Sequence, residues 1–219
     1  MPGREAWRKE RLHVAGIASR AGRCNRLRFG FPPMPSDKEY EERISKCSRR
    51  GVLALWRQVE ARDTPGWDAG KACEYCILRA FQLEKATVFW PYHVYDQHDP
   101  SLELEQMDGS ILVNGRYYLA SVKDETDPLN IDPIAKLRNQ LLRRPWGVVG
   151  LLFSRSGFTL QAFREAELTA NPPVLLWVGD EIDAALRTRT MVRSLEVKYR
   201  VAVTHGSFDY NSLEPPPGR

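Results

Sequence analysis

The sequence lacks several features that define whole classes of protein. No apolar run approaches the roughly 18 residues of a membrane span, since the longest, 148–153 and 174–178, have the length of strands. The N-terminus is basic and has no apolar stretch like that of a secretory signal, so we expect a cytoplasmic protein without membrane contact. Four cysteines among 219 residues do not suggest a disulfide framework. An ordinary globular domain remains, because 42% of the residues are hydrophobic and can build a full core.

The positive charge of the chain is concentrated at its N-terminus. Residues 1–31 hold eight Arg and Lys against two Glu, so this segment carries +6 and the remainder carries −2. We therefore expect residues 1–35 to form a basic, disordered tail, which either solubilises the protein or lies along a polyanion. A helical extension is expected at 36–66, the main domain at 67–205 and a flexible tail at 206–219.

The pattern of apolar residues predicts helices and strands in alternation. Asn114-Gly115 is the strongest short hairpin signal in the sequence, and Asp132-Pro133 is typical of a helix start with Asp as the N-cap. The predicted elements are, in order, helices at 37–62 and 69–81, strands at 86–95, 104–113 and 116–123, a helix at 132–143, a strand at 148–153, a helix at 160–169, a strand at 174–178 and helices at 180–188 and 190–203.

The order of elements between 68 and 153 indicates the fold class. A helix, three strands, a second helix and a fourth strand follow one another, with a hairpin at the start and a helical crossover later. A hairpin and a crossover in one sheet make the sheet mixed, with helices on both faces. The sequence therefore predicts a single α/β domain built on an αβββαβ core.

Charges of opposite sign occupy neighbouring segments. Residues 96–132 hold nine acidic residues against only Arg116 and Lys123, whereas 133–144 holds four basic residues and no acid. Carboxylates can hold Mg²⁺ through hard oxygen ligands, and cations can hold a phosphate backbone. The pattern favours metal-assisted phosphodiester chemistry, although acids also gather in turns and helix caps without any such role.

Spacing within the predicted hairpin singles out two residues. Asp108 lies in its first arm, and Lys123 lies in the second arm on the same face as Tyr117, Leu119 and Ser121. In the functional interpretation, Asp108 binds the metal ion. Lys123 then positions a water molecule and stabilises the charge that builds on the phosphate.

Four segments resemble the restriction-endonuclease-like PD-(D/E)XK nucleases. They are EQMDG at 105–109, LASVKDE at 119–125, IDPIAKLRNQLLRRP at 131–145 and GLLFSRSGFT at 150–159. The resemblance spans roughly 68–185 and implies an αβββαβ core and hydrolysis of nucleic acid with Mg²⁺ or Mn²⁺. It also implies that Asp108 is a metal ligand and Lys123 the catalytic lysine. Glu74 corresponds to the acid of the first core helix, and Gln140 to the polar residue that the next core helix presents to the site.

The chain departs from that family at one central position. The family has Asp or Glu two residues before the lysine, where this chain has Ser121. A serine hydroxyl is a poor Mg²⁺ ligand and carries no negative charge. Glu125, about 6.6 Å beyond Lys123 on the same strand face, could substitute, as could Glu74 or Glu105. Without a substitute, the fold would keep binding and lose cleavage.

The helix at 132–143 supports contact with nucleic acid in either case. Lys136, Gln140 and Arg143 share one flank of this helix, beside the expected site. We expect Lys136, Arg143 and Arg144 to contact phosphates, although cations at the end of a helix also simply complement its dipole. Cys73 and Cys76 have a zinc-like spacing, but both fall on the buried stripe of the first core helix and are interpreted as core residues.

Two functions remain open at the level of sequence. The first is a Mg²⁺-dependent endonuclease acting on nucleic acid, with double-stranded DNA as the favoured substrate, in prokaryotic defence or a mobile element. The second is a catalytically degenerate module that uses the same fold to bind nucleic acid or to assemble a complex. In either case the chain could act as a homodimer or with a partner subunit.

Overall fold

The computed structural model describes residues 35–168 and 171–215. The basic tail expected at 1–35 lies almost wholly outside these residues. The helices are α1 (Asp37–Ser45), α2 (Arg49–Glu60), α3 (Lys71–Leu83), α4 (Asp132–Leu142), α5 (Leu160–Leu168), α6 (Gly179–Thr188) and α7 (Met191–His205). No helix in the described ranges is long and apolar enough to cross a membrane.

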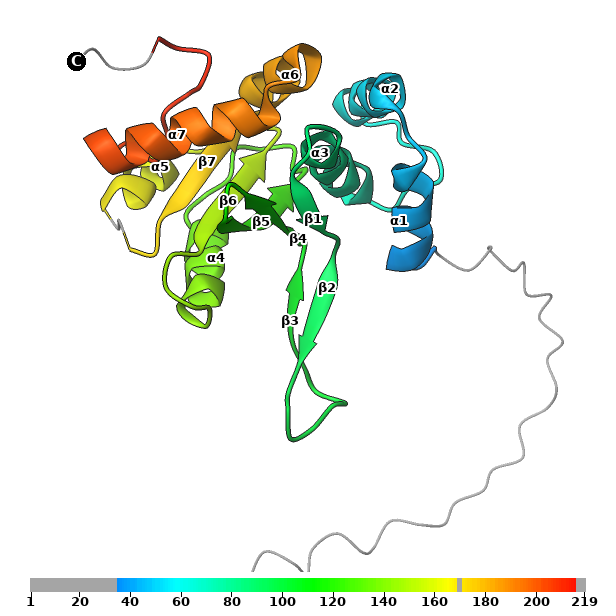
Figure 1. The fold of residues 1–219 in the computed structure, drawn as a ribbon, viewed down its shortest axis with the longest axis horizontal. Helices are drawn as coiled ribbons and strands as arrows, with labels where there is room; N and C mark the ends of the chain where they lie inside the picture. The colour runs from blue at the N-terminus through cyan, green and yellow to red at the C-terminus, as the bar shows by residue number, and fades with distance from the viewer. Residues whose placement is uncertain (1–34, 169–170, 216–219) are drawn as a thin grey trace, which may run out of the picture. The chain divides into compact units, whose positions relative to one another are not determined.

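The centre of the fold is a five-stranded mixed sheet (Figure 1). Its strands are β1 (Thr87–Phe89), β4 (Gly109–Val113), β5 (Arg116–Lys123), β6 (Val149–Ser154) and β7 (Val174–Val178), side by side in that order. The pairs β1–β4 and β4–β5 are antiparallel, whereas β5–β6 and β6–β7 are parallel. Every residue of β6 is buried, as its unbroken apolar run predicts.

The predicted hairpin is confirmed. Strands β4 and β5 pair from Gly109↔Ala120 to Val113↔Arg116, and the turn between them is Asn114-Gly115. Both turn residues have positive φ, 49° and 76°, which is the conformation that Asn-Gly favours and that matches the twist of the two strands.

Two of the predicted strands are each divided in two. Residues 86–95 form β1 and β2 (Tyr92–Tyr95), interrupted at Trp90 and Pro91, as a proline in a strand predicts. Residues 104–113 form β3 (Glu103–Met107) and β4, interrupted at Asp108. Strands β2 and β3 pair with each other in a separate two-stranded sheet, and this ribbon extends away from the main sheet (Figure 1).

The single helix expected at 37–62 is wrong, because the chain forms two helices there. Helix α1 ends at Ser45, and α2 begins at Arg49 after a short connection. The side chain of Ser48 accepts a hydrogen bond from the backbone N–H of Gly51 and so caps α2. Another prediction at a helix start is also corrected: Asp132 is the first residue of α4, whose N-cap is Ile131.

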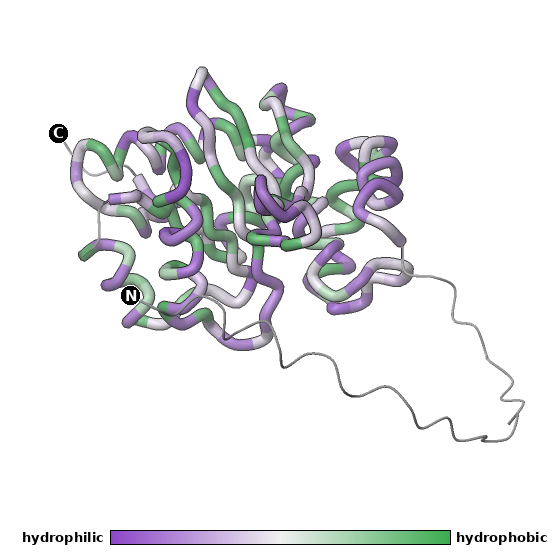
Figure 2. The backbone as a smooth tube through the Cα atoms, turned by 90° about the horizontal axis from the view of Figure 1, so that it is seen from below, coloured by the Kyte–Doolittle hydropathy of each residue, from purple (hydrophilic) through white to green (hydrophobic). Residues whose placement is uncertain are grey.

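Helices cover both faces of the sheet. On one face, the ring of Phe81 from α3 lies 6.2 Å from the rings of both Phe153 and Trp177. On the other face, Leu137 and Leu141 of α4 pack so closely on Gly150 that a side chain there would meet both at 3.0 Å. Figure 2 shows hydrophobic segments gathered in the middle of the fold and hydrophilic ones along its periphery.

The order α3, β1, β4, β5, α4, β6 is the αβββαβ order of the restriction-endonuclease-like core, so the predicted fold class is confirmed. The ribbon formed by β2 and β3 is an extension of the first two core strands beyond the sheet.

The segment after α7 is packed, in contrast to the flexible tail expected from 206 onwards. Phe208 and Tyr210 are buried, and the carbonyl of Phe208 accepts a hydrogen bond from Leu176 of β7. The buried ammonium of Lys198 lies 2.9 Å from Glu181 and donates to the carbonyl of Tyr210. This ion pair therefore ties the segment to the domain, and only 216–219 of the expected tail lie outside the described residues.

Candidate active site

The backbone at Asp108 turns its carboxylate toward the neighbouring strand. Asp108 lies between β3 and β4 and is followed by Gly109, whose φ is +152°. A Cβ at Gly109 would lie 2.8 Å from Leu78 and 2.9 Å from the carbonyl oxygen of Phe89. Only glycine fits this close approach, so Gly109 permits the bend that places Asp108 at the site.

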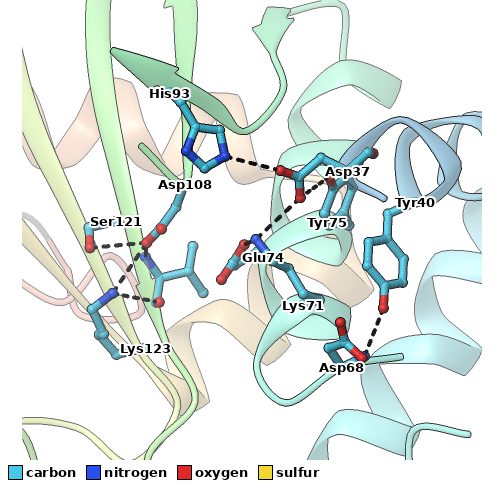
Figure 3. Close-up of polar contacts among 11 residues, drawn as sticks. Asp37, Tyr40, Asp68, Lys71, Glu74, Tyr75, His93, Asp108, Ser121 and Lys123 are labelled. Carbon is cyan, nitrogen blue, oxygen red and sulfur yellow. Dashed lines mark hydrogen bonds and ion pairs between the residues drawn. The ribbon is translucent and has the colours of Figure 1, made fainter. Parts of the chain in front are cut away.

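Strand β5 surrounds that carboxylate with donors. Asp108 Oδ2 accepts hydrogen bonds from the backbone N–H of Val122 at 2.8 Å and from the hydroxyl of Ser121 at 3.2 Å. The ammonium of Lys123 lies 3.3 Å from the same oxygen (Figure 3). The sequence-predicted pair of Asp108 and Lys123 is therefore in direct contact, and Ser121 contacts the same oxygen of Asp108.

Helix α3 contributes a second carboxylate. Glu74, the acid predicted on the first core helix, lies close enough to Asp108 for the two charges to repel. Burial, together with the charge of Asp108, raises the pKa of Glu74 to about 7, although Lys71 and Lys123 act in the opposite direction. Figure 3 shows the carboxylate of Glu74 between Asp108 and Lys71.

Lys71 is a site residue that the sequence analysis missed. Its ammonium lies 2.9 Å from Glu74 and 3.5 Å from Asp37 of α1. Burial acts to lower the pKa of Lys71, but the hydrogen bond to Glu74 and the charges of Glu74, Asp37 and Asp108 outweigh burial and raise it. A lysine three residues before an acid on one helix is the signal that could have identified it.

Further polar contacts join α1 and the ribbon to Lys71. Asp37 accepts a hydrogen bond from the hydroxyl of Tyr75 at 3.3 Å. The imidazole of His93 on β2 lies 3.5 Å from Asp37 and 3.1 Å from Glu103 on β3. The helical extension is thus part of the surroundings of the site, since Asp37 fixes one side of Lys71 (Figure 3).

Two other acids proposed as metal ligands have different surroundings. Glu105 is buried and forms ion pairs with Arg143 and Arg144 at the end of α4. Its carboxylate is therefore committed to two guanidinium groups. Glu125 is exposed just beyond β5, and its backbone carbonyl accepts a hydrogen bond from Arg62.

The residues predicted on α4 face the ribbon. Gln140 is buried, and its side-chain amide lies 3.5 Å from the carbonyl of Gln106. Lys136 and Arg143 line a groove of about 680 Å³ together with Glu103 and other residues of β3. The cations expected to contact phosphate therefore lie beside acidic side chains, and that contact stays a prediction.

The site offers carboxylate and carbonyl oxygen atoms, which are the ligand type that a hard cation prefers. Within 35–168 and 171–215, no group of three or more Asp, Glu, His or Cys residues is arranged to hold a metal ion. Two carboxylates, Asp108 and Glu74, are nevertheless close to each other. The ammonium of Lys123 lies 3.3 Å from both Asp108 and the carbonyl oxygen of Val122, so this carbonyl is a third oxygen at the site.

The cysteines are core residues, as predicted. Cys73 and Cys76 are free and buried, and burial raises the pKa of both thiols. The thiol of Cys76 lies 3.5 Å from the carbonyl of Val52. A thiol that resists ionisation is a poor ligand for zinc.

No protein-family model matches the chain, and no curated protein matches it. Among solved structures, the chain is similar to the MspJI restriction endonuclease in complex with a 27-mer oligonucleotide, at 17% identity and a TM-score of 0.39. The matched region covers 83% of this chain and 40% of that chain, so the likeness concerns less than half of the endonuclease. The fold class rests on the order and pairing of the elements described above, which define an α/β domain with an αβββαβ core and a mixed sheet.

Proposed function

We propose that the chain is a metal-dependent phosphodiesterase that acts on nucleic acid, with double-stranded DNA as its substrate. The observation that carries this proposal is the convergence of Asp108, Lys123 and Glu74. They come from the bend between β3 and β4, from β5 and from α3, and meet within one partly buried cluster. Acids and lysines gathered in this way suit the hydrolysis of a phosphodiester.

Asp108, Glu74 and the carbonyl of Val122 are the groups that would hold the metal ion. All three offer oxygen atoms, which Mg²⁺ and Mn²⁺ prefer. A bound divalent cation would supply positive charge to the phosphate oxygens. The mutual repulsion of Asp108 and Glu74 supports this assignment, because a cation between two carboxylates relieves it.

The lysines stabilise the negative charge that develops on the phosphate. Lys123 is held by Asp108 and by the carbonyl of Val122, so its ammonium is fixed before the substrate arrives. A fixed ammonium needs little reorganisation during the reaction and stabilises the transition state more than a mobile one. Lys71 holds Glu74 from the opposite side and keeps its carboxylate oriented.

A second function is favoured by one observation, the serine at position 121. Its hydroxyl donates a hydrogen bond to Asp108 where the related nucleases would have a further carboxylate. A site with one ligand fewer binds a dication less tightly. The second candidate is therefore a module that binds nucleic acid through the same fold and does not cleave it.

Cleavage of supercoiled plasmid and linear duplex DNA with Mg²⁺ or Mn²⁺ tests the first function. The wild type should cut, and Asp108→Asn and Lys123→Ala should lower the rate at least a hundredfold. Glu125→Gln is the matched control, because Glu125 is exposed and lies two residues after Lys123. This substitution should leave the rate unchanged. Loss of cleavage in this variant would instead make Glu125 the missing ligand.

Calorimetric titration of Mg²⁺ separates the two functions further. Ser121→Glu adds a carboxylate beside Asp108 and should tighten Mg²⁺ binding in a degenerate site, whereas a complete site should gain little. If neither the wild type nor Ser121→Glu binds Mg²⁺, and neither cuts DNA, the metal-site proposal is wrong.

A further inference from the structure

A large groove lies on the sheet that carries the candidate site, and several aromatic side chains line it. Its volume is about 1130 Å³, enough for several planar rings of a ligand. It lies across β1, β4 and β5 and is bordered by the loop that joins α4 to β6. The aromatic residues that line it are Phe89, Trp90, Tyr92, Tyr117, Tyr118 and Trp146.

The groove and the candidate site share one strand. Side chains alternate along β5, so Tyr117 and Leu119 in the groove point to the same sheet face as Ser121 and Lys123. Tyr117 precedes Lys123 by six residues, which is roughly 20 Å along a strand. That length corresponds to about six base steps of a nucleic-acid strand in B-form geometry.

Three of the rings are open to a ligand. Phe89 is 43% exposed, Tyr117 48% and Trp146 89%. The rings of Phe89 and Tyr117 lie 6.0 Å apart, so they form one continuous aromatic surface. Large exposed aromatic side chains that cluster in a groove mark a binding site, whereas single exposed rings carry no such meaning.

The charged residues of the groove indicate the ligand. Arg116 and Arg144 line it, Arg144 is also ion-paired with Glu105, and Glu41 is the one acid among the lining residues that the structure describes. The guanidinium of Arg116 lies over the ring of Tyr199 at 4.3 Å, which orients it beside the groove. Aromatic faces bind nucleobases by stacking, and arginines bind the phosphates between them.

We propose that this groove binds an unpaired stretch of nucleic acid, whose bases stack on Tyr117, Phe89 and Trp146. The bases of a duplex already stack on each other, so only unpaired bases offer their faces to aromatic side chains. The inference rests on the proposed function, since it places an unpaired flank of the substrate on the sheet face of Lys123. It assigns the protein a preference for junctions between duplex and single strand over uninterrupted duplex.

Fluorescence anisotropy with a labelled 12-nucleotide thymidine oligomer in EDTA tests the groove without metal or cleavage. Trp146→Ala and Tyr117→Ala should each weaken binding by roughly fivefold to 150-fold, since stacking contributes about that much for each base. Tyr95→Ala is the matched control, because Tyr95 is 48% exposed, as Tyr117 is, but lies on the ribbon outside the groove. Tyr95→Ala should leave the affinity unchanged.

Three outcomes would overturn the proposal. The first is a wild type that does not bind the oligomer, and the second is equal binding by the two groove variants and Tyr95→Ala. The third is a dimer in light scattering that Trp146→Ala converts to monomers while oligomer binding persists, because the groove would then be an interface between two copies.

Cleavage distinguishes failure of the groove from failure of the proposed function. A wild type that cuts duplex DNA but does not bind the oligomer refutes the groove alone. Groove-dependent binding of the oligomer, without cleavage of any DNA and without Mg²⁺ binding, refutes the phosphodiesterase alone.

Discussion

The ionisation of Glu74 should make the free energy of unfolding depend on pH. Glu74 is buried beside Asp108, and its pKa is about 7 in the folded protein against an ordinary value of 4.5. Between these two values the folded protein retains a proton that the unfolded chain has released. The stability that this proton contributes is fully present below pH 4.5 and is lost as the pH rises through 7.

The size of the effect follows from the two pKa values. A difference of about 2.5 pKa units corresponds to about 3 kcal/mol of the free energy of unfolding. The steepest loss expected from this single group is about 1.4 kcal/mol per pH unit, between pH 5 and 6.5. The substitution Glu74→Gln removes the ionisable group, so the wild type should lose about 3 kcal/mol relative to this variant between pH 4.5 and pH 8.

Urea unfolding at a series of pH values, in EDTA, measures this difference. Glu125→Gln is the control, since it removes the same charge from an exposed position, and its stability should run parallel to that of the wild type. Parallel profiles for the wild type and Glu74→Gln would refute the reasoning, because Glu74 would then ionise alike in the folded and unfolded chains.

Substitutions at three further positions test the packing of the domain, by urea unfolding at pH 7. Lys198→Ala leaves the buried carboxylate of Glu181 without its partner and should cost about 3–5 kcal/mol, whereas Lys198→Met should cost less. Gly109→Ala should cost about 2 kcal/mol or more, since its Cβ would meet Leu78 and its φ is unfavourable for alanine. Glu84→Ala should cost about 1 kcal/mol, because Glu84 accepts hydrogen bonds from the first backbone N–H groups of α7. For each of these variants, a stability equal to that of the wild type would contradict the expectation.

Local sequence patterns were enough to predict the strands and turns that are determined by residues adjacent in the sequence. The apolar run at 148–153 predicts a strand buried on both faces, and β6 is such a strand. Asn114-Gly115 adopts the positive φ values that define its turn, so the pairing of β4 with β5 follows from two residues. Because Asp108 directly precedes β4 and Lys123 is the last residue of β5, their proximity could be predicted as well.

The bend at Asp108 could not be read from the residues around it. The run 104–113 fits one continuous strand, yet it divides at Asp108 because Leu78 of α3 and the carbonyl of Phe89 close around Gly109. These contacts come from segments about 20 and 30 residues earlier in the chain. A glycine in a strand indicates close approach, but not of which neighbours.

The ion-pair partners of the acidic residues could not be predicted from the sequence either. Glu105 was a reasonable metal ligand on the strand that leads to Asp108, yet it pairs with Arg143 and Arg144, which lie almost 40 residues later. Asp37 belongs to a helix that the sequence places outside the main domain, yet it contacts Lys71 at the site. Such pairs depend on tertiary packing, and hydrophobic periodicity carries no information about them.

The charges of the site suggest how the serine at position 121 changes the behaviour of the fold. With Glu74 ionised, the carboxylates of Asp37, Glu74 and Asp108 face the ammonium groups of Lys71 and Lys123, and a carboxylate at 121 would add a further negative charge. With serine at 121 the site is less negative, so it attracts a dication less strongly and repels a phosphate less strongly. A phosphodiester brings its own negative charge and would increase the affinity for the cation, and by linkage the cation would increase the affinity for the phosphodiester by the same factor. Binding of a divalent cation and binding of nucleic acid should therefore strengthen each other in this chain.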